Sequence, residues 1–217
     1  DHLLAEELVE AEWTRPRVAL RAWERAERYM TLPIRRHIES LEAATTAHEV
    51  DVHSDDVPFH YAEWAAVPGI YMVPLKSPTI PPATHTNCLL VGEERFVVID
   101  PGSPYDDQQT GLRRLIQQML DDDRVFEAVV LTHHHRDHVT GVEDLVGHFG
   151  CAVWAHPKTA EHVDFGVDRE LQDEEVIDLG AHSLRCLFTP GHASGHLCFH
   201  HERTNAIFGG DLVASMG

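Results

Sequence analysis

The sequence predicts a layered α/β domain preceded by a short helical segment. Three observations indicate this. Short apolar runs rich in β-branched residues alternate with amphipathic runs of helical period, and residues of metal-ligand type gather where the apolar runs end. Of the 217 residues, 43% are hydrophobic, which is enough to build a substantial core. The two kinds of run alternate along the chain as expected for a sheet covered by helices.

The first part of the chain, residues 1–47, is predicted to be helical. Leu4, Leu8 and Val9 recur at helical spacing, and a second amphipathic run places Leu20 and Trp23 on one face. A third short helix is expected to begin at Pro33, because proline is well tolerated in the first helical turn. We expect these apolar stripes to pack against a core.

A second domain, residues 48–217, is expected after the polar and non-periodic stretch 45–59. Its predicted helices are residues 108–120 and 141–150. Its predicted strands are bounded by glycine and proline and rich in Val, Ile, Leu and Phe: residues 69–75, 87–92, 95–102, 127–133, 151–156, 176–180, 182–190, 196–201 and 205–211. A site is expected at the carboxyl ends of these strands.

Charge and cysteine usage narrow the classes of partner. The formal net charge of -19 disfavours nucleic acid and anionic membranes as partners, so nucleic acid stays possible only through a bound cation or a local basic patch. The four cysteines lie far apart and are expected to be reduced core residues. There is no secretory pattern and no long apolar run, which predicts a cytoplasmic protein. The partner expected in place of nucleic acid or a membrane is a small-molecule substrate. The oligomeric state is left open.

Four histidines and one aspartate are concentrated in the sequence THHHRDH, residues 132–138, directly after the apolar run 128–131. In an extended segment, alternation puts His133 and His135 on one side, and a tighter turn would aim Asp137 and His138 at a neighbouring point. Unpaired, such a cluster would be costly to bury. Imidazole and carboxylate ligands suit zinc first, with iron or manganese as alternatives, so the pattern predicts two adjacent metals.

Two later turns add candidate ligands. His192 lies in the glycine-flanked turn TPGHASGH, residues 189–196, and Asp211 ends the sequence FGGD, residues 208–211. Glycine allows the sharp backbone that brings a side chain close to a crowded site. Asp211 has two carboxylate oxygens and could bridge two metals.

Together, HHHRDH, TPGHASGH and FGGD resemble the metallo-β-lactamase fold, and the half-motifs HTNCLLVG and FVVIDPGS extend the likeness over residues 69–217. Within that superfamily the sequence is most similar to the β-lactamase-like protein 2 group and the glyoxalase II-type hydrolases. The resemblance implies an αββα sandwich. Residues 13–43 also resemble, weakly, the closing helices of a nudix hydrolase domain, without its glutamate-rich signature.

The resemblance also implies roles for individual residues. His133, His135 and His192 would hold a first zinc, Asp137 and His138 a second, and Asp211 would bridge the two ions. Asp100 would orient the metal-binding loop. A zinc-bound hydroxide would attack an ester, thioester or amide, and Asp137 is a candidate proton acceptor.

One departure from the family is visible in the sequence. The family completes its second metal with a histidine near the end of the fold, and no histidine follows Asp211 here. The resemblance therefore predicts an αββα sandwich truncated at its C-terminus, in a chain that is a fragment of a longer protein. His196, His200 and His201 lie in a strand-like context and are expected to have no role at the metals. Two alternatives stay open: a metal-dependent RNA phosphodiesterase and a catalytically incomplete metal-binding module.

Overall fold

A computed structural model of the chain describes residues 17, 59–64, 67–79 and 83–212. The helices expected in residues 1–47 and the nudix resemblance lie outside the described residues, Arg17 excepted. The expected division of the chain between residues 47 and 48 therefore stays a prediction.

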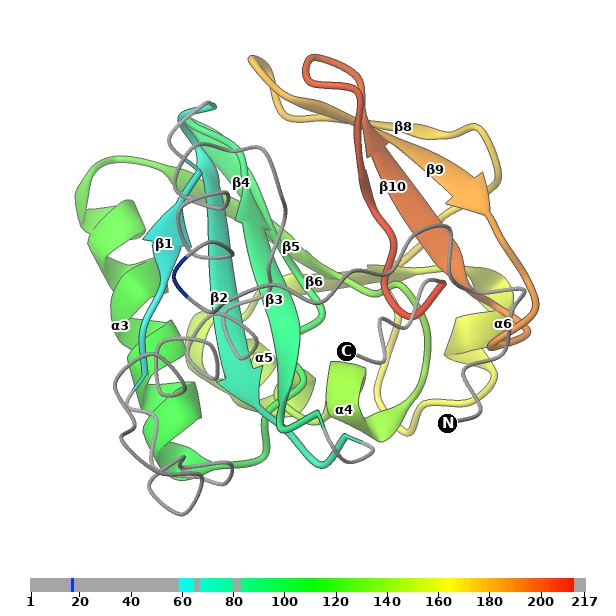
Figure 1. Ribbon diagram of the computed structural model, residues 1–217, viewed down its shortest axis with the longest axis horizontal. Helices are drawn as coiled ribbons and strands as arrows, with labels where there is room; N and C mark the ends of the chain where they lie inside the picture. The colour runs from blue at the N-terminus through cyan, green and yellow to red at the C-terminus, as the bar shows by residue number, and fades with distance from the viewer. Residues whose placement is uncertain (1–16, 18–58, 65–66, 80–82, 213–217) are drawn as a thin grey trace. The chain divides into compact units, whose positions relative to one another are not determined.

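Two sheets form the scaffold (Figure 1). The larger has seven strands in the order of the chain, and the smaller has four strands in the order β11-β10-β9-β8. The larger sheet comprises β1 (Ala62–Glu63), β2 (Ile70–Lys76), β3 (His85–Val91), β4 (Arg95–Ile99), β5 (Val125–Val130), β6 (Ala152–Ala155) and β7 (Arg169–Glu170). The smaller sheet comprises β8 (Val176–Asp178), β9 (Ser183–Phe188), β10 (Leu197–His201) and β11 (Ala206–Phe208).

The pairing between neighbouring strands changes from antiparallel to parallel once within the larger sheet, at β4. Strands β1 to β4 pair antiparallel, whereas β4 to β7 pair parallel. Parallel neighbours need crossover connections. The helices α3 (Asp106–Asp121) and α5 (Val142–Phe149) are the main crossovers, and two single-turn helices, α4 (Arg136–Val139) and α6 (Pro157–Ala160), follow β5 and β6.

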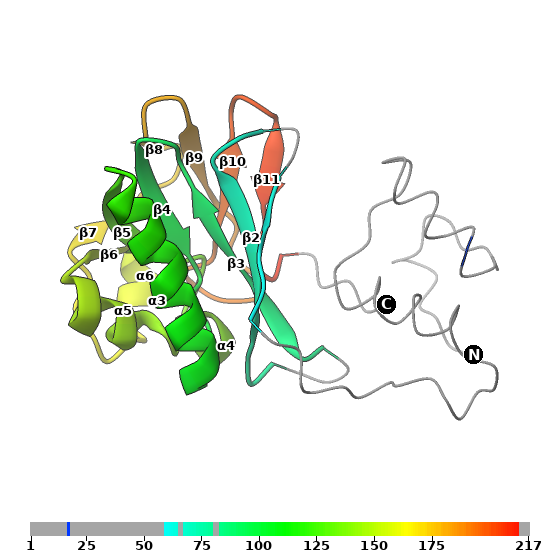
Figure 2. The ribbon, with the colours of Figure 1, turned by 90° about the vertical axis from the view of Figure 1, so that its left-hand side faces the viewer.

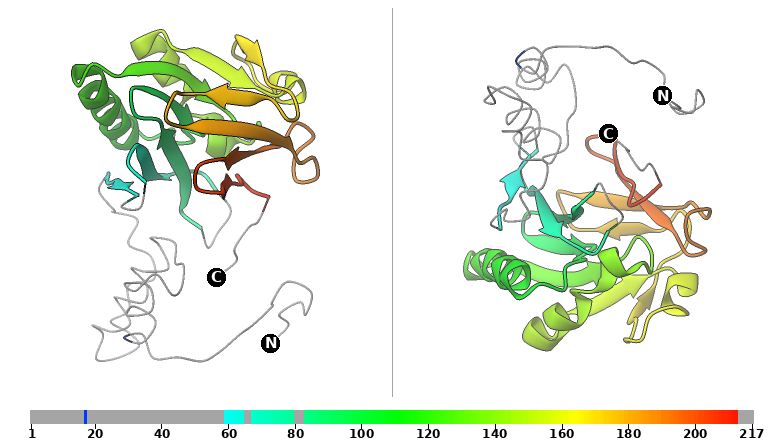
Figure 3. Two further views of the ribbon diagram at one scale, coloured as in Figure 1. Left: turned by 90° about the horizontal axis from the view of Figure 1, so that it is seen from above. Right: turned by 60° about the horizontal axis from the view of Figure 1, so that its bottom comes forward.

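Each face of the larger sheet has its own core. Helices α3 and α5 cover one face and the smaller sheet lies over the other (Figures 2 and 3). On the helical side Phe96 and Val98 pack with Ile116 of α3 and Leu145 of α5. On the other side the neighbouring β4 residues Val97 and Ile99 pack with residues of the smaller sheet such as Leu184, Leu197 and Phe199. Strand β4 is buried on both faces, which explains its continuous apolar sequence.

The expected αββα arrangement is therefore confirmed for a helix layer and two facing sheets. All nine strands and both helices predicted in the second domain are present, with ends shifted by a few residues. The strand expected over residues 127–133 ends at Val130. Leu131 N still donates to the Trp154 carbonyl of β6, but Thr132 N donates to the side chain of Asp100, so the strand pairing does not continue. The cysteines are free, as expected: Cys88, Cys186 and Cys198 are buried and Cys151 is half-buried.

One close backbone approach connects the fold to the histidine segment. The loop after β4 runs against α4, so that a Cβ placed on Gly102 would lie 1.7 Å from the carbonyl oxygen of Asp137. Thr140 Oγ1 also donates to the Gly102 carbonyl at 2.8 Å. Only a residue without a side chain lets the two segments meet in this way.

Replacing Gly102 with alanine is expected to lower the free energy of unfolding by about 1–3 kcal/mol, because backbone must move to admit the methyl group. The matched control is Gly147→Ala in α5, where nothing lies within 4 Å of the added Cβ. That change should raise stability by about 0.5–1 kcal/mol through helix propensity. Urea denaturation of both variants checks this, and equal stabilities would contradict it.

Candidate metal centre

The residues expected to bind metal come together from three loops. Strand β5 leads into the segment that carries His133, His135 and α4, the turn after β9 carries His192, and the turn after β11 carries Asp211. The three segments meet at one place, because the ligand atoms of His133, His135 and His192, and those of His133, His138 and Asp211, lie within 4.8 Å of one another.

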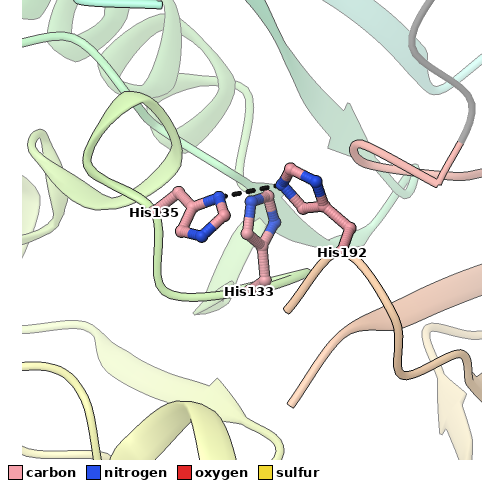
Figure 4. A group of neighbouring side chains, drawn as sticks. All are labelled: His133, His135 and His192. Carbon is pink, nitrogen blue, oxygen red and sulfur yellow. Dashed lines mark hydrogen bonds between the residues drawn. The ribbon is translucent and has the colours of Figure 1, made fainter. Parts of the chain in front are cut away.

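Three imidazoles form the first group: His133, His135 and His192 (Figure 4). The ring centroid of His133 lies 4.5 Å from that of His135 and 4.9 Å from that of His192. The His135 Nδ1 and His192 Nε2 atoms are 2.8 Å apart. One nitrogen from each ring lies within 4.8 Å of the others, a separation at which they could converge on one ion.

His133, His138 and Asp211 form a second group whose ligand atoms also lie within 4.8 Å of one another. The Nε2 atom of His138 is 3.2 Å from Asp211 Oδ1, and His192 Nε2 is 3.5 Å from Asp211 Oδ2. The two oxygens of Asp211 therefore face one histidine from each group. This is the placement that a bridging carboxylate needs.

Asp137 lies beside the second group without belonging to it. Its Oδ2 atom is 3.9 Å from His138 Nε2, and its side chain is only 16% exposed. Its role as a ligand or as a proton acceptor stays a prediction.

A buried carboxylate organises the second group from behind. Asp100, at the end of β4, is 2% exposed. Its Oδ1 accepts from the Thr132 backbone N at 2.8 Å, and its Oδ2 accepts from Thr132 Oγ1 at 2.5 Å and from His138 Nδ1 at 2.8 Å. Asp100 adopts a positive φ of 51°, which aspartate tolerates better than most residues. These contacts agree with the expected role of Asp100 in orienting the loop.

The histidines differ in their electrostatics. Burial, with the neighbouring charges of His138 and His135, lowers the pKa of His133 to about 2, so this ring is neutral near pH 7. Burial also acts to lower the pKa of His138, but Asp100 and Asp211 outweigh it and raise that pKa to about 10. The hydrogen bond from His138 lowers the pKa of Asp211 to about 2 against the effect of burial.

The His133 ring fits a metal ion. Its Nδ1 contacts Thr132 Oγ1 at 3.0 Å, whereas its Nε2 is buried with no hydrogen-bond partner among the described residues. An unpartnered polar atom in a buried position is unusual, since buried nitrogens nearly always have a partner. The imidazoles and the carboxylate beside this atom are ligands of the type that zinc accepts.

Some histidines do not join the two groups. His134 contacts the ring of His162 at a centroid distance of 4.5 Å. His201 is buried and bonds to His182 Nδ1 at 2.9 Å and to Thr204 Oγ1 at 2.6 Å. His200 bonds to Asn205 Oδ1 at 2.8 Å. The expectation that His200 and His201 are strand residues agrees with these contacts.

The position of His196 differs from the expectation that it lies in a strand away from the candidate metal ligands. Its ring is fully buried and lies 5.1 Å from the ring of His133, between centroids. Sequence reasoning missed it because burial beside another loop is a long-range property. The second histidine of the segment TPGHASGH was the available signal.

A family comparison agrees with this geometry: the family model described as Metallo-beta-lactamase superfamily matches residues 81–217, more than half of the chain. The chain belongs to the metallo-β-lactamase superfamily. This confirms the resemblance inferred from the histidine, TPGH and GGD motifs.

Curated relatives and solved structures show the same superfamily. A hydroxyacylglutathione hydrolase from Maricaulis maris is 38% identical over 86 residues, which cover 40% of this chain and 33% of that relative. An atrochrysone carboxyl ACP thioesterase from Aspergillus chevalieri is 35% identical over 136 residues, which cover 61% of this chain and 41% of that relative. A metallo-beta-lactamase family protein from Thermus thermophilus superposes with a TM-score of 0.56 at 23% identity, over 70% of this chain and 62% of that one.

The chain spans less than half the length of these two curated relatives. Both relatives carry the names of hydrolytic enzymes, the class that the sequence resemblance implies. The likeness to the Thermus protein bears out the fold. Among the described residues, no helix combines the length and the apolar character that crossing a bilayer would require.

In metal-stripped protein, the free energy of unfolding should fall as pH rises from about 6.5 towards 10. The folded pKa of His138, about 10, exceeds its unfolded value, so its stabilisation is complete below about pH 6.5 and is lost as pH rises through about 10. Asp100→Asn removes the negative charge that does most to raise the pKa of His138, so it should flatten this slope. The free energy of unfolding of this variant should be about 3 kcal/mol lower than that of the parent at pH 7. Urea denaturation across pH measures both, and an unchanged slope in the variant would contradict the assignment.

Proposed function

We propose that this chain is the metal-binding part of a hydrolase that cleaves a thioester or a related ester or amide. The single observation that carries the proposal is the pair of ligand groups that meet at His133, with Asp211 facing both. A lone structural site would need only one closed set of four protein ligands. The described ligands of the first group number three, which leaves a coordination position for water or substrate.

In this proposal, His133, His135 and His192 hold a first zinc ion and His138, Asp137 and Asp211 contribute to a second. Iron or manganese would accept the same ligands. Zinc bound there would supply Lewis acidity, which lowers the pKa of water and stabilises the negative charge that develops on a carbonyl oxygen.

The chain's own residues do the positioning. Asp100 accepts a hydrogen bond from His138 Nδ1, which leaves His138 Nε2 directed towards Asp211. Because the pKa of His138 is about 10, a metal would have to displace the Nε2 proton before this nitrogen serves as a ligand. Histidine ligands held by a carboxylate in this way keep one tautomer and one ring orientation. Because His133 is neutral near pH 7, it offers a lone pair without first losing a proton.

Asp137 is the proposed proton acceptor. It is half-buried and lies beside His138, close to the second group. A carboxylate in that position could take a proton from an attacking water and deliver it to the leaving group.

A thioester is the first substrate class to test. One relative is named a thioesterase and another a hydroxyacylglutathione hydrolase, and each of them matches only part of this chain. A small acyl substrate also agrees with the net charge of -19, which would repel the phosphates of RNA. An RNA phosphodiesterase and a metal-binding module without activity are therefore outcomes of the test.

The test combines metal analysis with turnover. We expect elemental analysis to find bound zinc that chelation removes, together with loss of thioester hydrolysis that added zinc restores. A short RNA serves as the comparison substrate. Cleavage of RNA without thioester turnover would favour the phosphodiesterase, and bound metal with neither activity would make this chain a binding module.

Asp137→Asn should lower kcat for thioester hydrolysis by about 10²–10⁴-fold, the usual contribution of a general base. The matched control is Glu143→Gln, which neutralises an exposed carboxylate on α5 and should leave kcat unchanged. Steady-state kinetics and metal content are measured on the same samples. A loss of bound metal in Asp137→Asn would attribute the fall in kcat to the metal-binding role of Asp137, and an unchanged metal content would attribute it to proton transfer.

A further inference from the structure

His196 is a fully buried histidine that the proposed reaction does not use. It lies immediately before β10, between the turn that carries His192 and the segment that carries His133. Its backbone N donates to the Ala193 carbonyl at 3.2 Å, and its carbonyl accepts from Thr189 N at 2.9 Å. These two bonds close the turn around His192.

A backbone hydrogen bond beside His196 joins the turn that carries His192 to the segment that carries His133. Leu197 N donates to the Thr132 carbonyl at 2.8 Å, so the start of β10 is joined to the residue that precedes His133. Thr132 is also the residue that Asp100 holds through two hydrogen bonds. The His192 turn and the His133 segment are thus joined directly beneath the site.

The His196 side chain extends these connections. Its Nδ1 lies 2.9 Å from Thr189 Oγ1, at the start of the His192 turn. Its ring packs against the ring of His133 at a centroid distance of 5.1 Å and an interplanar angle of 37°. One imidazole therefore contacts both segments that carry the first metal group.

The other ring nitrogen faces the third ligand-bearing turn. His196 Nε2 is buried without a hydrogen-bond partner among the described residues. A Cβ placed on Gly210 would lie 2.9 Å from this nitrogen and 2.7 Å from Thr132 Oγ1. Gly210, with a φ of 50°, directly precedes Asp211. The backbone that presents Asp211 therefore passes against the edge of the His196 ring.

We propose that His196 is a positioning residue that sets the spacing of the three ligand-bearing segments, those of His133, His192 and Asp211. This inference rests on the proposed function, because it concerns the same metal centre. An aliphatic residue could fill the volume but could not bond to Thr189. A shift of one ångström in a ligand is enough to weaken a site, and partners that orient ligands typically contribute about 10–100-fold to metal affinity.

The test compares substitutions that keep or remove the bond to Thr189. His196→Leu removes it, whereas His196→Asn retains a polar atom near the position of Nδ1. His200→Leu is the matched control, since His200 lies on β10, four residues after His196, and its side chain bonds to Asn205 in the turn between β10 and β11. Zinc affinity is measured by competition with a chromophoric chelator, and the visible spectrum of the cobalt-substituted full chain reports ligand geometry.

We expect His196→Leu to weaken zinc binding by about 10–100-fold and to alter the cobalt spectrum, and His196→Asn and His200→Leu to stay within about threefold of the parent. A folded His196→Leu protein with parental affinity and spectrum would overturn the inference. If His196→Leu does not fold, Thr189→Val decides: weakened zinc binding with an altered cobalt spectrum supports the inference, and parental values overturn it.

Failure of the proposed function gives a different result. Parent protein that binds zinc but hydrolyses no thioester contradicts the hydrolase proposal, while the affinities and cobalt spectra still test His196. Parent protein that binds no metal overturns both. Activity alone is therefore never the deciding measurement for His196.

Discussion

The geometry of the metal centre depends on the buried carboxylate of Asp100. Three hydrogen bonds end on its two oxygens, two from Thr132 and one from His138. A carboxylate buried at the end of a strand would be strongly unfavourable without such partners. Asp100 thus needs the histidine segment as much as the segment needs Asp100. The interaction couples the end of β4 to the end of β5, neighbours in the sheet that lie about thirty residues apart in the chain.

The double-sided burial of β4 makes this anchor rigid. Its residues pack alternately against the helices and against the smaller sheet, so the strand that leads to Asp100 cannot shift without disturbing both cores. Gly102 then brings the next loop into backbone contact with α4. Two contacts therefore determine the position of His138: the hydrogen bond of its Nδ1 to Asp100, and the contact of the Gly102 loop with the backbone of α4.

The remaining ligands are positioned by the smaller sheet. Strands β9 and β10 bring the His192 turn over the larger sheet, and β11 leads to the Gly209–Gly210 turn before Asp211. Polar side chains are enclosed where these segments meet, and each needs a partner in the protein or a bound ion. His196 is one of these enclosed side chains, and so is His133, whose Nε2 has no hydrogen-bond partner among the residues that the structure describes.

Much of this protein could be predicted from its sequence. Apolar runs of three or four residues identified β4, β5 and β10, and the helical period identified α3 and α5, because these signals are local. The candidate ligand residues were also recognisable, since His133, His135 and His138 share one short segment and the glycine turns marked His192 and Asp211. Single-turn helices such as α4 and two-residue strands such as β7 were missed, because so few residues carry no periodicity.

Only the tertiary structure decided how these parts meet. The burial of His196, the placement of Asp211 between His138 and His192, and the position of Asp137 beside the second group all depend on contacts between segments far apart in the chain. The sequence by itself determined which residues are candidate metal ligands and which strands precede them. The packing of two sheets against each other determined their distances and protonation, because both depend on which side chains become neighbours when water is excluded.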